Sequence, residues 1–210
     1  MTVSTEIVET VPQPMTDDAG VPPESLYRLT VEQYHAMARE GILTDDDPVE
    51  LLEGWLVPKM VRNPPHDTAL ELAVEMIRPC LPGGWRIRVQ SAITLSDSEP
   101  EPDVAVVRGP LRSHTNRHPG PADVGLLVEV ADSSLAQDRN EKGRVYARAG
   151  IIAYWIVNLV DNQVEVYTAP SGPVAAPAYG QRQDYQPGSL VPVVIGGQPV
   201  GQVAVTDLLP

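Results

Sequence analysis

Two carboxylates lie in or beside apolar runs of the sequence, where charged side chains are unusual, and one lysine is expected to face them. Glu129 occupies the middle of the apolar run 125–131, and Asp103 opens the apolar run 104–107. Runs rich in Val and Leu predict strands that are buried on both faces. An ionised carboxylate buried there is costly unless it is paired, so Glu129 requires a basic side chain or a metal ion. Two strand carboxylates with a nearby lysine, Lys142, would bind a divalent metal ion and activate water.

Helical spacing indicates that Lys142 faces the sheet. We expect a helix over residues 137–149, closed by Gly150, and residues at intervals of three, four and seven share one stripe on it. That stripe contains Asp138, Lys142, Val145, Tyr146 and Ala149. Its apolar members should pack on the sheet, which leaves Glu141, Arg144 and Arg148 on the outer face. In the alternative interpretation, Lys142 extends along the sheet and only pairs with Asp138.

Length and composition describe a single globular domain with an added tail. The chain has 210 residues, of which 42% are hydrophobic and 20% charged, values that are ordinary for a globular protein. Residues 1–24 are acidic and proline-rich, which predicts a disordered tail before a domain over residues 25–210. No membrane span or signal peptide is evident. The single cysteine, Cys80, permits no intrachain disulfide, so we predict a cytoplasmic protein.

The net charge of −13 argues against a nucleic acid as the partner, because contacts with phosphate dominate that kind of affinity. The charge is unevenly distributed, however. Residues 59–148 carry 12 basic and 12 acidic residues, whereas the flanks carry 3 basic and 16 acidic residues. A neutral central region would become locally positive when its carboxylates bind a divalent ion.

The remaining pattern predicts an α/β fold, with a mixed β-sheet flanked by helices and a β-rich C-terminal part. Thr30 and Gln33 resemble a capping box for a helix that ends near Glu40. A hairpin is expected around Glu53 and Gly54, and an amphipathic helix over residues 67–81. The predicted strands span 85–90, 92–95, 103–107, 125–131, 153–159, 163–167, 190–195 and 200–205, and residues 169–186 are predicted to form a loop.

Several ordered motifs resemble the Uma2 family of bacterial endonucleases, which belongs to the PD-(D/E)xK restriction-endonuclease-like superfamily. They are Glu101-Pro-Asp-Val-Ala-Val-Val, Leu126-Leu-Val-Glu-Val-Ala-Asp-Ser-Ser, Asp138-Arg-Asn-Glu-Lys-Gly-Arg-Val-Tyr and Tyr154-Trp-Ile-Val-Asn. The segment Val49-Glu-Leu-Leu-Glu-Gly-Trp-Leu and the Pro-Pro-His66 step also match. The resemblance covers residues 29–167 and implies an endonuclease dependent on Mg²⁺ or Mn²⁺ that cleaves DNA, with a homodimer as a further expectation.

Carried over by position, the resemblance implies that Asp103 and Glu129 bind the metal. The superfamily's lysine usually lies two residues after the second acid, where this chain has Ala131. The family places the lysine on the following helix instead, at Lys142, which the stripe also selects. Glu50 matches a further acid that would bind a second metal ion or orient water. Gln90 is a weaker candidate ligand.

Other interpretations of these residues remain open. Asp103 could be a turn residue, Glu129 part of a structural salt bridge, and Glu50 a solvated charge. For contact with the nucleic-acid backbone, the candidates are His66, Arg112, Arg117 and Arg139, although His66 could simply cap a helix. The alternative function is a catalytically inactive binding module that keeps the nuclease fold. The acidic balance and the absence of Phe, which leaves no evident platform for stacking bases, motivate it.

Overall fold

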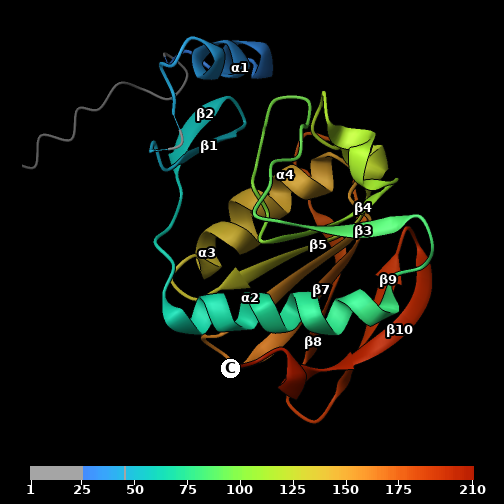
Figure 1. Cartoon of the computed structure of the whole chain (residues 1–210). Coiled ribbons are helices and arrows are strands. Elements are labelled where there is room, and N and C mark those ends of the chain that lie inside the picture. The colour runs from blue at the N-terminus through green and yellow to red at the C-terminus, as the bar shows by residue number, and fades with distance from the viewer. Residues whose placement is uncertain (1–25, 45) are drawn as a thin grey trace, which may run out of the picture.

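A mixed sheet of six strands forms the centre of the molecule (Figure 1). The computed structural model describes residues 26–44 and 46–210, so the predicted tail over residues 1–24 lies outside the described residues. The strand order is β3 (Trp85–Val89), β4 (Val104–Arg108), β5 (Val124–Ala131), β6 (Ala153–Asn158), β7 (Gln163–Pro170) and β8 (Tyr179–Tyr185). Neighbours are antiparallel except β5 and β6, which are parallel. The predicted α/β class with a mixed sheet is therefore confirmed.

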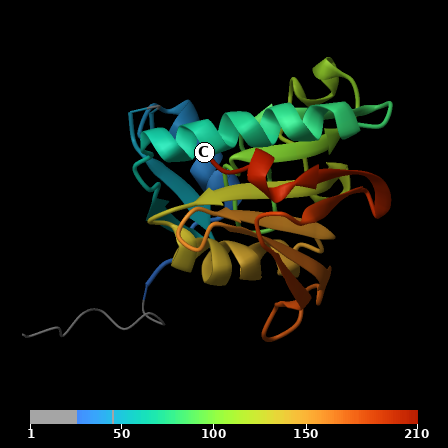
Figure 2. The same cartoon turned by 90° about the horizontal axis from the view of Figure 1, so that it is seen from below.

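Helices and a second hairpin cover the two faces of this sheet. Helix α2 (Pro64–Ile77) and the hairpin of β9 (Leu190–Ile195) and β10 (Gln198–Ala204) lie on one face, and α3 (Leu135–Gln137) and α4 (Gly143–Arg148) lie on the other (Figure 2). The parallel β5–β6 pair requires a crossover, and the α3–α4 segment supplies it.

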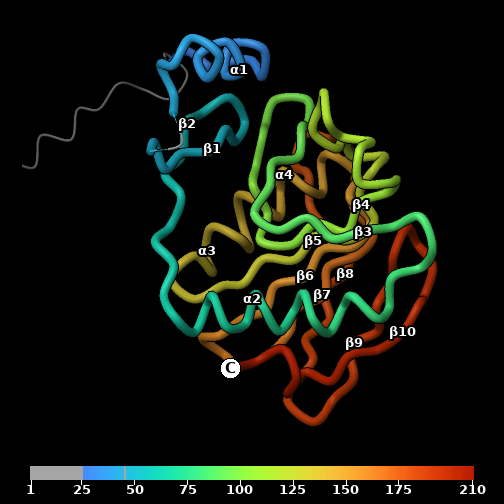
Figure 3. The backbone as a smooth tube through the Cα atoms, in the orientation of Figure 1, coloured from blue at the N-terminus to red at the C-terminus, as the bar shows by residue number. Residues whose placement is uncertain are grey.

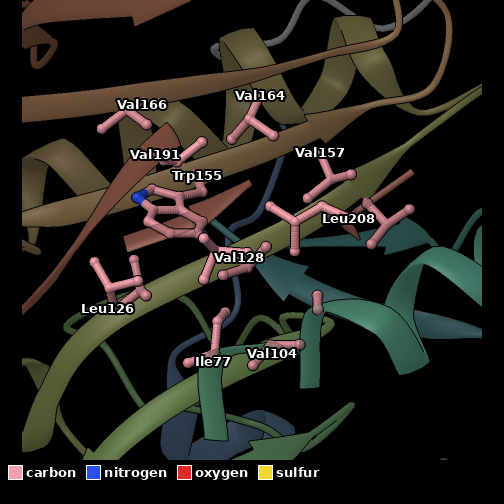
Figure 4. Packing of buried hydrophobic residues seen from close by; sticks show 14 of the residues in the cluster. Ile77, Val104, Leu126, Val128, Trp155, Val157, Val164, Val166, Val191 and Leu208 are labelled. Carbon is pink, nitrogen blue, oxygen red and sulfur yellow. The ribbon is translucent and has the colours of Figure 1, made fainter. Parts of the chain in front are cut away.

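Alternation along the central strands builds a core on each face. Val128 and Trp155 belong to the cluster under α2 and β9 (Figure 4), whereas Leu127 and Ile156 belong to the cluster under α4. All eight residues of β5 are buried. Burial on both faces explains why the sequence of this strand is apolar except at Glu129.

The N-terminal elements lie beyond the end of the sheet (Figure 1). Helix α1 (Val31–Arg39) begins with the predicted capping box, in which the Gln33 amide donates to Thr30 Oγ1 at 3.2 Å and the Thr30 amide donates to Gln33 Oε1 at 2.9 Å. The predicted hairpin is also confirmed, as β1 (Val49–Leu52) and β2 (Trp55–Pro58). Its turn holds Glu53 and Gly54 at φ values of 51° and 81°.

Two predicted elements were wrong in kind. Residues 92–95 form no strand, although Ile93 and Leu95 are buried. Their amides donate to the carbonyls of Pro100 and Ser98, so this loop folds back on itself instead of pairing with the sheet. Residues 179–185, predicted as loop, form the edge strand β8. It is largely exposed and polar on both sides, so no alternating apolar pattern marked it in the sequence.

Two predicted helices have different bounds or geometry. Helix α2 begins at Pro64, because Asn63 caps it and proline is well suited to the first helical position. The helix predicted over 137–149 begins at Leu135 and contains a π-helical segment, Asp138–Lys142, between α3 and α4. Such π segments frequently occur at functional sites. Within the described ranges, no helix is long and apolar enough to cross a membrane.

Candidate active site

An open cleft of about 900 Å³ lies where α2, the start of β4, the end of β5 and the β1–β2 hairpin meet. Asp103, Glu129, Lys142 and Glu50, the four predicted catalytic residues, all line it. They come from four separate elements, so only the fold brings them together. The cleft lining contains seven Asp or Glu residues against three Lys or Arg residues, which makes the site strongly acidic.

Asp103 is held as an ionised carboxylate directly before β4. Its Oδ2 accepts hydrogen bonds from His66 Nε2 at 3.1 Å and from the Val130 amide at 2.9 Å, while Oδ1 accepts one from Gln90 Nε2 at 3.2 Å. Burial by itself would raise the pKa of Asp103, but the hydrogen bonds and the His66 imidazole outweigh it and lower that pKa below its ordinary value. The alternative of an ordinary turn residue does not account for these contacts.

Glu129 projects from β5 toward α4 and is 2% exposed. Its Oε1 accepts hydrogen bonds from Lys142 Nζ at 3.0 Å and from the Tyr146 hydroxyl at 2.7 Å, and its Oε2 accepts one from the Asp103 amide at 3.2 Å. Burial raises the pKa of Glu129 above its ordinary value; Lys142 opposes this shift, but neighbouring acids add to it. The surrounding protein therefore supplies less positive charge than this cluster of acids requires.

Lys142, in the π-helical segment, points toward the sheet as the stripe predicted. Its Nζ lies 3.0 Å from Glu129, 3.7 Å from Glu50 and 3.8 Å from Asp138, and its side chain is 11% exposed. Burial alone would lower the pKa of Lys142, but the three carboxylates raise it above its ordinary value. The alternative pairing with Asp138 is thus present as well, as one contact of three.

Glu50 is a buried acid, not a solvated one, because it is 3% exposed on β1. Its Oε2 accepts a hydrogen bond from the Glu101 amide at 3.0 Å. The hairpin that carries it is docked through Glu53, which accepts hydrogen bonds from Arg144 at 3.0 Å and Arg148 at 2.9 Å. These two arginines lie off the sheet-facing stripe, as predicted, and they join α4 to the hairpin, so they position Glu50.

The residues predicted to contact nucleic acid are not brought together. His66 is buried and its ring contacts Asp103. Arg112 and Arg117 belong to the loop after β4, at the opposite end of that strand from Asp103, and Arg117 pairs with Asp123 at 2.7 Å. Arg139 pairs with the buried Glu165. None of the three arginines lines the cleft, so their contact with nucleic acid stays a prediction.

Sequence reasoning named two further side chains of the stripe but missed some of their contacts. The Tyr146 hydroxyl bonds to Glu129, although the stripe had assigned Tyr146 only to packing. Asp138 is 2% exposed and accepts a hydrogen bond from Ser134 at 2.7 Å. Both lie on the same stripe as Lys142, so the signal was present. Gln90, a weak candidate before, contacts Asp103 from a left-handed backbone at φ 45°.

The donor atoms of this cluster fit a hard divalent ion. Among the described residues, no three His, Cys, Asp or Glu side chains form a ready metal-binding group. Mg²⁺ needs no such group, because it keeps several waters and is usually bound through one or two carboxylates plus phosphate oxygens. Asp103 Oδ1 and Glu129 Oε2 each accept one hydrogen bond from the described part of the chain. Each oxygen therefore retains a lone pair for an ion.

Comparisons with known proteins identify the fold and the family of this chain. A solved structure described as a “putative nuclease belonging to DUF820” from Anabaena variabilis matches with a TM-score of 0.61 and 16% identity, over 86% of this chain and 97% of that one. This likeness establishes the fold. No curated protein matches the chain. The family model described as “Uma2: Putative restriction endonuclease” matches residues 31–195. The chain therefore belongs to the Uma2 family of nuclease-like proteins.

Proposed function

We propose that this protein is a metal-dependent endonuclease that hydrolyses phosphodiester bonds in DNA. The observation that carries the proposal is that Asp103, Glu129, Glu50 and Lys142 line one open cleft, in which Lys142 Nζ lies 3.0 Å from Glu129 and 3.7 Å from Glu50. Membership of a nuclease family supports the reaction class. The excess of buried acids over bases supports a cationic cofactor, for which Mg²⁺ or Mn²⁺ is the natural choice with oxygen donors.

Asp103 and Glu129 would hold the ion through the oxygens that keep a free lone pair. A bound divalent ion would lower the pKa of water and offset charge on the phosphate. Lys142 would place its ammonium group beside the attacked phosphate or position the attacking water, and Glu129 and Glu50 fix the place of that ammonium group. The Tyr146 hydroxyl donates to Glu129, and the His66 ring bonds to Asp103. Each contact would orient one of the two acids that hold the ion.

The test is nicking of supercoiled plasmid by the purified full chain in Mg²⁺, in Mn²⁺ and in EDTA. Asp103→Asn and Glu129→Gln should abolish metal-dependent nicking. Glu75→Gln, which removes an exposed acid of α2 outside the cleft, should leave it unchanged. Far-UV circular dichroism and thermal melting of each variant separate a lost site from a lost fold.

Nicking that persists in both folded site variants would refute the assignment of the metal site. Absence of nicking by the folded wild-type chain, together with no binding of Mn²⁺ in a calorimetric titration, would favour the alternative of an inactive binding module with the nuclease fold.

A further inference from the structure

Figure 3 traces the segment that joins β2 to α2. Its residues 59–62 line the cleft. We call residues 59–62 the strap. Its first residue donates from the Lys59 amide to the Pro48 carbonyl at 2.7 Å. The residue that follows it, Asn63, caps α2 and donates to Asp132 at 2.6 Å. The strap is thus anchored at both ends beside the acid cluster.

The strap carries the cations of the cleft that a ligand can reach. Of the three Lys or Arg residues that line the cleft, Lys142 is 11% exposed and surrounded by carboxylates. Lys59 is 34% exposed, and Arg62 is also exposed. A polyanion that enters this cleft would therefore meet Lys59 and Arg62 before it reaches Lys142.

The present partners of these two cations are easily exchanged. Lys59 Nζ lies 2.8 Å from Glu101, whose side chain is 31% exposed, and Arg62 donates to the neutral side chain of Gln90. Exposed ion pairs of this kind contribute about 0–1 kcal/mol. A phosphate group offers a charge-assisted and bidentate partner to a guanidinium, which is stronger than a neutral amide.

Between the two cations, the strap exposes two apolar side chains. Val61 is 91% exposed and Met60 is 49% exposed. Apolar side chains flanked by basic ones suit a nucleic acid, whose phosphates alternate with the apolar faces of sugars and base steps. The same pattern would gain nothing from a small inorganic anion, which offers no apolar surface.

We propose that the strap binds the phosphate backbone of duplex DNA, with Lys59 and Arg62 exchanging Glu101 and Gln90 for phosphate oxygens. The inference rests on the proposed nuclease function, and it names backbone contacts inside the cleft, which Arg112, Arg117 and Arg139 do not line. Gln90 also donates to Asp103 at 3.2 Å. When Arg62 leaves Gln90 for a phosphate group, this shared Gln90 side chain would couple DNA binding to Asp103.

The test is fluorescence anisotropy of a labelled duplex of mixed sequence over a series of salt concentrations, with Ca²⁺ in place of Mg²⁺ and intact DNA checked on gels. Log affinity falls with log salt, and each lost phosphate contact makes this negative slope shallower by about 0.9. The Lys59→Ala/Arg62→Ala variant should bind at least tenfold more weakly and lose about 1.8 from that slope. Lys59→Arg/Arg62→Lys should restore most of both.

The matched control is Arg39→Ala/Arg78→Ala, which removes two exposed arginines outside the cleft lining. An unchanged slope in the strap variant, an equal loss in the control, or no duplex binding by the wild-type chain would overturn the inference. Measuring nicking and duplex binding in the same variants distinguishes failure of the nuclease proposal from failure of the strap proposal. Binding that depends on the strap without any metal-dependent nicking refutes the nuclease, whereas nicking with an unchanged slope refutes the strap.

Discussion

The buried carboxylate of Glu165 provides a test of how the π-helical segment beside the site is held against the sheet. Glu165 lies on β7 and is fully buried. It accepts hydrogen bonds from Arg139 Nε at 3.1 Å, from Asn158 at 2.7 Å and from the Tyr167 hydroxyl at 2.6 Å. Burial by itself would raise the pKa of Glu165, but these donors outweigh it and lower that pKa to about 2.

The shift converts into a pH-dependent contribution to stability. A carboxyl whose pKa falls from 4.5 to about 2 on folding contributes about 3 kcal/mol at pH 7. Because the folded pKa is the lower one, the contribution is complete above pH 4.5 and is lost as the pH falls toward 2. At pH 3 linkage leaves about 1 kcal/mol of it. Replacing Glu165 with glutamine removes the titrating group and keeps the size of the side chain.

The assay is urea unfolding of the wild-type chain and of Glu165→Gln at pH 7 and at pH 3, followed by circular dichroism. The variant should be less stable by about 3 kcal/mol at pH 7, and the gap should narrow by more than half at pH 3. A gap that is the same at both values of pH, or a variant as stable as wild type at pH 7, would refute the reasoning. A variant as stable as wild type would also show that the Arg139–Glu165 pair does not stabilise the fold, which would favour the predicted contact of Arg139 with nucleic acid.

Two further substitutions test the support of the site. Tyr146→Phe removes the hydroxyl that donates to Glu129 at 2.7 Å, so urea unfolding should show a loss of about 1.5–3 kcal/mol, and plasmid nicking should fall with it. Unaltered stability would show that the hydroxyl does not hold the carboxylate. Gly54→Ala places a Cβ at φ 81° and 2.7 Å from Arg28 Cβ, and it should cost more than about 1 kcal/mol in the same assay. Gly84→Ala, at φ 86° with open space around it, measures backbone strain alone, and an equal loss there would rule out the clash.

Local patterns in the sequence determined the elements that have a strong local signal. The capping box at Thr30, the hairpin at Glu53 and Gly54, and the apolar strand around Glu129 were all predicted correctly. Strand β8 was missed because an exposed edge strand needs no apolar side, and its identity comes from backbone pairing with β7. The loop over 92–95 was mistaken for a strand because burial alone gives the same apolar composition.

The sequence also determined which charged residues are anomalous, because a carboxylate inside a buried strand must have a partner. It selected Lys142 by helical spacing, and the structure places that ammonium group 3.0 Å from Glu129. Only the tertiary structure decided what surrounds this pair. His66 reaches Asp103, and the docking of Glu53 on α4 places Glu50, through contacts between residues 37 to 95 positions apart in the chain. Contacts across such separations depend on how the layers pack, and no periodicity within one element records them.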